Sequence, residues 1–243
     1  MRYLISLFAA FQFLSLTSAA GAQDFWHTEN IQILRGETYE LGSDGRTIVT
    51  VEHANRWSHG DLFLFTDFTF ADDGSIAAYG EITPRFSLER MFGLDFGDGP
   101  VRDVFLTLNY ERGEQGLERY LGGISADLDL PGFVFFRVMA LHRDDPTRPG
   151  TTHQLTLAWN RPVTIGQTRL LFEGFSDIAG AEGTGVANTL FVPRALVNLG
   201  SLYGEPGNLW AGVEWQYWDN KFGVDGVTES VVQLQLKWVL DWG

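Results

Sequence analysis

The stretch ESVVQLQLKWVLDWG occupies residues 229–243 and alternates in polarity along most of its length. Successive side chains of a β-strand point to opposite faces of the sheet. One set of alternate positions is apolar: Val232, Leu234, Leu236, Trp238 and Leu240. The positions between them include the polar residues Gln233, Gln235 and Lys237. It therefore predicts a strand with one apolar face and one polar face that carries a charge. Lipid on one side and water on the other would suit both faces.

The first 22 residues form a different kind of segment. Arg2 precedes an apolar run over residues 3–16, and small residues follow at 20–22. This order is typical of a secretory signal peptide, and we expect cleavage after Ala22. A membrane anchor is the alternative, but the apolar run is shorter than the roughly 20 residues that a spanning helix needs. Residues 23–243 are predicted to form one domain.

The charge and the absence of cysteine narrow the class of protein. Without Arg2, the mature chain has 16 basic and 31 acidic residues, a formal charge of −15, and it has no cysteine. So acidic a surface, without a basic patch, argues against a nucleic-acid partner. An exported chain without disulfides must be held together by backbone pairing and packing.

Short alternating segments recur along the whole mature chain. They are separated by clusters of Gly, Asp, Asn and Pro, which favour turns, and no segment sustains a helical period. The pattern predicts an all-β domain of about twelve strands. The expected strands cover residues 28–36, 45–54, 60–70, 76–89, 101–112, 117–129, 132–143, 151–161, 167–178, 188–201, 208–220 and 229–240.

Aromatic residues at the ends of the apolar rows favour a membrane barrel. Tyr110, Trp159 and Tyr217 each finish such a row. Aromatic side chains gather at the two water–lipid interfaces of outer-membrane barrels, whose sheets must close because lipid cannot satisfy an open edge. We therefore predict a transmembrane antiparallel β-barrel in the bacterial outer membrane. A secreted β-sandwich or jelly roll is the alternative.

The polar parity of each strand would line the lumen of such a barrel. It combines rings, carboxylates, amides and guanidinium groups, which can together hold a solute that has a flat face and hydroxyl groups, such as a nucleoside or a sugar. The alternative is that acidic and basic side chains pair to fill and stiffen the interior. The predicted solute-contacting residues are Phe63, Asp67, Tyr79, Glu81, Arg85, Phe105, Arg137, Glu173, Phe175, Asp177, Glu214 and Trp218.

Five stretches carry a resemblance to a known family. They are TVEHANRWSHGDLFLFTDF (50–68), YGEITPRFSL (79–88), RDVFLTLNYERG (102–113), ADLDLPGFVFF (126–136) and GVEWQYWDNKFGVDGVTESVVQLQLKW (212–238). Together they resemble the nucleoside-specific channel-forming proteins of bacterial outer membranes, the Tsx-like family that includes OmpK.

The resemblance implies a monomeric twelve-stranded barrel with a narrow lumen, weak nucleoside sites and passive uptake. It also implies assembly by the outer-membrane barrel machinery, and some members of the family act as phage or colicin receptors through their outer loops. The family usually ends on Phe after the Lys-Trp pair, whereas this chain continues through residues 239–243. Trp238 or Trp242 is the expected terminal anchor.

Catalytic and metal sites are poorly supported by the sequence. The five histidines are scattered, there is no cysteine to complete a zinc site, and no full EF-hand loop is present. A barrel enzyme acting on lipid would require residues such as Ser58, His59 and Asp61 to converge, but neighbours on one turn point apart. We therefore predict no enzyme activity and no cofactor. Three hypotheses stand: a solute channel, a structural or receptor barrel with a plugged lumen, and a barrel enzyme.

Overall fold

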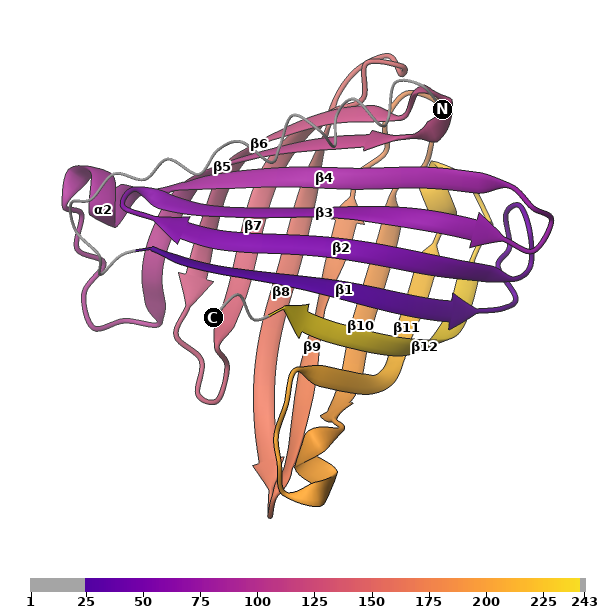
Figure 1. The fold of residues 1–243 in the computed structure, drawn as a ribbon. Coiled ribbons are helices and arrows are strands. Elements are labelled where there is room, and N and C mark those ends of the chain that lie inside the picture. The colour runs from indigo at the N-terminus through magenta and orange to yellow at the C-terminus, as the bar shows by residue number, and fades with distance from the viewer. Residues whose placement is uncertain (1–24, 241–243) are drawn as a thin grey trace.

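The computed structural model describes residues 25–240. Within them, twelve antiparallel strands form one closed barrel in which each strand pairs with its neighbours in sequence and β1 pairs with β12 (Figure 1). The predicted fold class is confirmed. The predicted signal peptide and Trp242 lie outside the described residues.

The strand bounds agree closely with the predicted segments. β12 covers the predicted residues 229–240, while β8 runs four residues further than expected, to Ile165. The strands are β1 (Trp26–Gly36), β2 (Arg46–Trp57), β3 (Gly60–Ala71), β4 (Ile76–Ser87), β5 (Val101–Gly113), β6 (Glu118–Leu128), β7 (Phe135–Asp144), β8 (Thr152–Ile165), β9 (Thr168–Ala179), β10 (Asn188–Asn198), β11 (Leu209–Asp219) and β12 (Glu229–Leu240).

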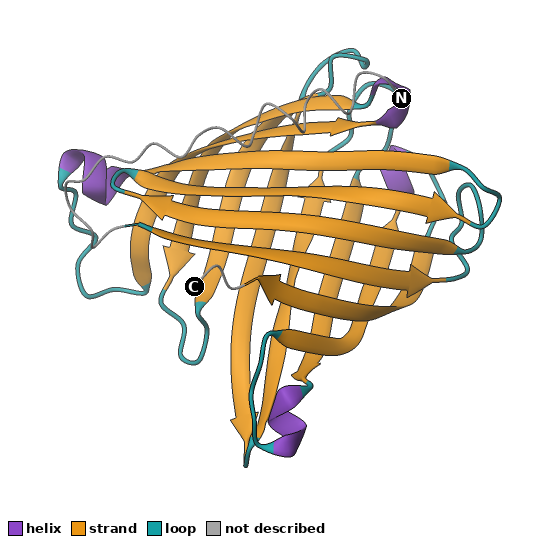
Figure 2. Ribbon diagram, viewed as in Figure 1, coloured by secondary structure: helices purple, strands orange, loops and turns teal. Residues whose placement is uncertain are grey.

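Short helical turns occur only in the connections of the described chain (Figure 2). They are α2 (Leu88–Phe92), η2 (Glu114–Gly116), η3 (Gly200–Tyr203) and η4 (Lys221–Gly223). The predicted strands 76–89 and 188–201 therefore end early. Ser87 ends β4 because its hydroxyl caps α2, accepting a hydrogen bond from the Arg90 amide at 3.1 Å. No helix in residues 25–240 is long and apolar enough to cross a membrane.

The two faces of the barrel wall differ as the terminal stretch predicts. On β12, Leu234 is 68% exposed, whereas Gln233 and Gln235, on either side of it, are 1% and 2% exposed. The apolar parity therefore faces outward and the polar parity faces the lumen. Outward apolar residues recur on other strands, including Leu106, Leu108, Ile124, Leu155, Phe172 and Ile178, which are all at least 38% exposed.

The barrel has two distinct ends. At one, which we call the terminal rim, β1 begins, β12 ends and the connections are 58–59, 88–100, 129–134, 166–167 and 199–208. α2 lies at this rim, at the left of Figure 1. At the other, the loop rim, the connections are 37–45, 72–75, 114–117, 145–151, 180–187 and 220–228.

Two adjacent glycines on β6 provide a test of the wall's packing. A Cβ on Gly123 would lie 2.1 Å from the carbonyl oxygen of Ala140, whereas a Cβ on Gly122 would meet only the Leu108 side chain, at 3.5 Å. We expect Gly123→Ala to lower the free energy of unfolding by about 1–3 kcal/mol because the paired strand must shift. Gly122→Ala is the matched control and should change it little. Urea unfolding followed by tryptophan fluorescence measures both, and equal effects would contradict the close approach of β7 to Gly123.

Candidate functional site

The lumen is the candidate site, and the strand alternation directs all twelve predicted residues into it. Their parities match those of inward neighbours that are at least nine-tenths buried, such as Thr107, Glu111 and Gln233. Buried apolar side chains that we did not predict also face inward, among them Leu34, Leu121, Leu141, Ala179, Val192, Leu196 and Val231. The lining of the lumen is thus mostly polar, with some apolar side chains among the polar ones.

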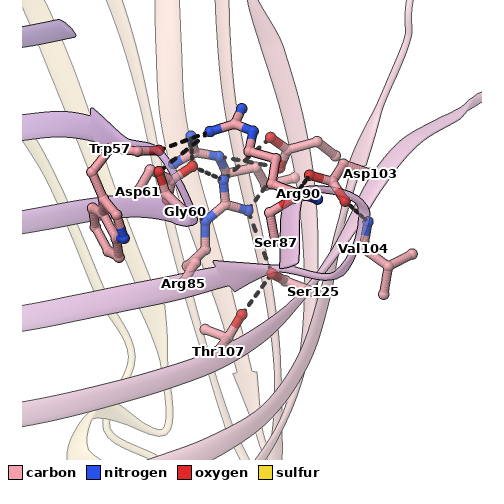
Figure 3. Close-up of polar contacts among 12 residues, drawn as sticks. Trp57, Gly60, Asp61, Arg85, Ser87, Arg90, Asp103, Val104, Thr107 and Ser125 are labelled. Atoms are coloured by element: carbon pink, nitrogen blue, oxygen red, sulfur yellow. Dashed lines mark hydrogen bonds and ion pairs between the residues drawn. The ribbon is translucent and has the colours of Figure 1, made fainter. Parts of the chain in front are cut away.

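Arg85 organises the part of the lumen nearest the terminal rim (Figure 3). Its guanidinium donates two hydrogen bonds to Asp61, at 2.7 and 2.6 Å, and two to Asp127, at 2.7 and 3.2 Å. It also stacks on Phe105, with the guanidinium carbon 4.0 Å from the ring centroid. Because β3, β4 and β6 each supply one member, this network joins strands that do not all pair directly.

Arg137 lies beside the same two carboxylates but is less tightly bound. Its Nε is 3.3 Å from Asp127 and its Nη2 is 3.7 Å from Asp61. The buried Nε has no hydrogen-bond partner. Arg137 therefore forms ion pairs with both carboxylates, while the hydrogen bonds to them come from Arg85.

Arg194 of β10 lies in the middle of the lumen, where it contacts three carboxylates. Its side chain lies 2.5 Å from Glu214, 3.5 Å from Glu52 and 4.0 Å from Glu173. These carboxylates come from β11, β2 and β9. Since β2 and β10 are far apart around the barrel, the Arg194–Glu52 contact reaches across the lumen. Lys237 of β12 donates a hydrogen bond to Glu173 of β9 at 2.6 Å.

Three of the predicted lumenal carboxylates have only neutral hydrogen-bond donors. Asp67 accepts from Thr50 at 2.6 Å, and Glu81 accepts from Tyr79 and Asn109 at 2.6 and 2.8 Å. Asp177 accepts from Thr156 and Gln154. None of the three lies within 4.0 Å of a Lys, Arg or His nitrogen among residues 25–240. The middle of the lumen therefore carries more carboxylates than cations.

A row of rings borders these carboxylates on β3 and β4. The centroids of Phe63 and Phe65 are 5.9 Å apart, and those of Phe65 and Tyr79 are also 5.9 Å apart. Tyr79 donates its hydroxyl to Glu81. An apolar strip flanked by hydrogen-bond acceptors can contact both the flat face and the hydroxyl groups of a solute.

Loop residues at the loop rim also enter the lumen. Tyr39 is 4% exposed and donates its hydroxyl to Gln233 at 2.7 Å, and burial raises the pKa of Tyr39. Lys221 pairs with Glu229 at 2.5 Å, and burial lowers the pKa of Lys221. Glu182, from the connection 180–187, is 4% exposed and lies 3.6 Å from Arg143. These side chains narrow the opening.

Several of these lumenal residues were not predicted from the sequence. Arg194 was missed because β10 is apolar on both parities, with Phe191 and Val197 outward and Val192 and Leu196 inward. Its charge within such a strand was the available signal, since an arginine facing lipid is costly. Tyr39 and Glu182 belong to loops, where alternation carries no information.

The residues considered for catalysis do not converge. Ser58 and His59 are hydrogen-bonded at 2.8 Å, but they are exposed, and Asp61 is bound by Arg85 instead. His53 faces outward and contacts Glu29 at 2.7 Å. No group of three or more His, Cys, Asp or Glu residues in the described part of the chain is arranged to hold a metal ion.

The fold is similar to those of solved structures titled as porins. The structure titled KdgM porin in complex with disordered oligogalacturonate matches with a TM-score of 0.51 and 9% identity, covering 87% of this chain and 99% of that one. The NanC porin matches with a TM-score of 0.55 and 9% identity, covering 86% and 98%. No protein-family model matches the sequence, and no curated protein matches it. At this identity the likeness concerns the fold.

Proposed function

We propose that this chain is a bacterial outer-membrane channel for the passive uptake of small polar solutes. The observation that carries the proposal is the wall, which is apolar outside and lined with charged and polar side chains inside. Such a wall suits lipid around the barrel and a solute path through it. The shared fold of two porins supports the same class of function. Export by a signal peptide cleaved near Ala22 and assembly as a monomer by the barrel machinery belong to this proposal.

Nucleosides are the solutes that we propose in particular. The ring row of Phe63, Phe65 and Tyr79 can stack on a base, while Asp67 and Glu81 can accept hydrogen bonds from ribose hydroxyls. The resemblance to the Tsx-like channels points the same way. Because a channel must release its solute, we expect weak binding, with dissociation constants of about 1 μM to 1 mM.

A plugged structural or receptor barrel is the second candidate, and the cross-lumen ion pairs favour it. Arg194 reaches from β10 to Glu52 of β2, and Lys237 reaches from β12 to Glu173 of β9. Ion pairs of this kind fill the interior of some small barrels. In that case the outer loops would be the functional surface, with phage or colicin as partners.

Liposome swelling distinguishes the two candidates. Refolded protein in vesicles is exposed to adenosine, thymidine, AMP and a disaccharide of similar size, and heat-modifiable gel mobility verifies folding. Faster swelling with the nucleosides than with the disaccharide supports the nucleoside channel. Equal swelling with all neutral solutes supports an unselective channel. No swelling from folded, inserted protein would favour the plugged barrel.

Reversing one lumenal charge should alter the selectivity. Asp67 is held only by Thr50, so Asp67→Lys adds a cation near the acidic middle without breaking an ion pair. We expect the ratio of AMP to adenosine uptake to rise about fivefold, because two unit charges about 4 Å apart interact by about 1 kcal/mol in water. Asp73→Lys, in the exposed turn 72–75, makes the same charge change outside the lumen. Equal ratios in the two variants would argue against a lumenal role for Asp67.

A further inference from the structure

A small cavity opens beside the Arg85 network at the terminal rim. Its volume is about 40 Å³, and it is lined by Trp26, Ala54, Asn55, Arg56, Asp61, Leu62, Phe63 and Arg137. One water needs about 10–15 Å³ of such space, so the cavity has room for a group of roughly three heavy atoms. The charged residues in its lining are two arginines and one aspartate, which leaves one positive charge in excess.

The two arginines of this lining retain free donor capacity. Asp61 and Asp127 are each bound twice by Arg85, so neither needs Arg137 to satisfy it. Among the described residues, the Arg137 side chain donates no hydrogen bond, although its Nε lies 3.3 Å from Asp127, and Arg56 has no ion pair within 4.0 Å. Asp103, the next lumenal carboxylate, already accepts from Ser87, from the Glu89 amide and from the Val104 amide.

Arg137 is also held in position before any ligand arrives. Its guanidinium carbon lies 4.5 Å from the centroid of the Phe135 ring, a cation–π contact. A planar guanidinium with free N–H groups matches the geometry of a carboxylate. The rings of Phe63 and Trp26 border the same cavity and offer an apolar surface to the rest of an organic molecule.

We propose that this cavity is a binding subsite for the carboxylate group of a small organic acid, received by Arg137 and Arg56. A singly charged group neutralises the excess positive charge of the lining. A doubly charged phosphate would leave a net negative charge beside Asp61 and would be repelled more strongly by the acidic middle of the lumen. The subsite rests on the proposed channel function, which supplies the solute. It extends the solutes that the channel admits to anionic sugars and similar acids.

Binding to the detergent-solubilised barrel tests the subsite without requiring transport. Isothermal titration calorimetry compares sodium glucuronate with glucose, its uncharged counterpart, and with glucose 6-phosphate. We expect glucuronate to bind most tightly. Arg137→Gln should weaken that binding about tenfold, since it removes charge-assisted hydrogen bonds to the carboxylate; a tenfold change corresponds to about 1.4 kcal/mol. Arg56→Gln should weaken it in the same direction and provides a second variant if the first fails to fold.

Arg102→Gln is the matched control. Arg102 lies on β5 at the same rim, faces outward and pairs with the exposed Asp129 at 2.6 Å. Its replacement should leave glucuronate binding within about twofold, as expected for an exposed ion pair. Equal binding of glucuronate and glucose, or equal affinity in Arg137→Gln, Arg56→Gln and Arg102→Gln, would overturn the subsite.

Swelling assays on the same proteins separate this inference from the channel function. Glucuronate binding that depends on Arg137, with no swelling by any solute, would support the subsite and overturn the channel. Swelling by glucose and glucuronate at equal rates, unchanged in Arg137→Gln and without measurable glucuronate binding, would support the channel and overturn the subsite.

Discussion

Arg194→Met is expected to lower the free energy of unfolding by about 3–5 kcal/mol, the cost of leaving buried charges without their partner. Arg194 contacts Glu214, Glu52 and Glu173, and the side chains of all four residues are at most 15% exposed. Without the guanidinium, three carboxylates from three strands would repel one another with only Lys237 near Glu173. Urea unfolding of the refolded protein in lipid vesicles, followed by tryptophan fluorescence, measures the loss.

A double variant separates lost electrostatics from lost packing. Glu214→Gln keeps the side chain's shape and an acceptor for Gln233, which donates to Glu214 at 2.7 Å, while removing one negative charge. Combined with Arg194→Met, it should recover about 1–3 kcal/mol relative to the sum of the single changes, as expected for residues in one network. Additive losses would show that Arg194 acts through packing alone.

Leu234→Arg is expected to lower the free energy of unfolding in lipid by about 2–4 kcal/mol, the cost of a cation near the bilayer midplane on the outer face of a barrel. Leu234 lies at the middle of β12 and is 68% exposed on the outer face. In water an arginine at an exposed position changes stability by only about 0.5 kcal/mol. The variant therefore tests whether lipid surrounds the barrel.

Ile165→Arg provides the control at a different depth. Ile165 is the last residue of β8, at the terminal rim, and it is 65% exposed. Its replacement should cost about 0–1 kcal/mol, as found near the membrane interface. Unfolding in vesicles of defined thickness measures both variants. Similar small losses at the two positions would contradict a membrane-spanning wall.

Together, these experiments also bear on how open the lumen is. If the Arg194 contacts form a permanent plug, Arg194→Met should increase swelling with small solutes as well as reduce stability. If solutes already pass beside Arg194, the swelling rate should change little while the stability still falls. The two readouts therefore assess the channel and the plugged barrel independently of the subsite at the terminal rim.

The fold could be predicted from the sequence because the relevant signal is local. Alternation along residues 229–240 reports which side chains face outward, and the same period recurs in segments of strand length between turns. Closure follows from the same pattern, since lipid cannot satisfy a free sheet edge. Phe63, Glu173 and Trp218 could be assigned to the lumen for this reason. Ser87 shows the limit, because its role in capping α2 was not visible in the alternation.

Only the tertiary structure decided which lumenal groups meet. Closure brings Arg194 of β10 to Glu52 of β2, more than 140 positions earlier in the chain, and no sequence pattern encodes that distance. The inward turn of loop residues Tyr39 and Glu182 has no periodic signal either. The parity of a side chain is a property of its own strand, whereas the partner of a charge depends on strand tilt, register and loop path together. The sequence by itself therefore determined a barrel with a polar, charged lumen. The tertiary structure determined which charges are paired and that the Arg137 Nε has no hydrogen-bond partner.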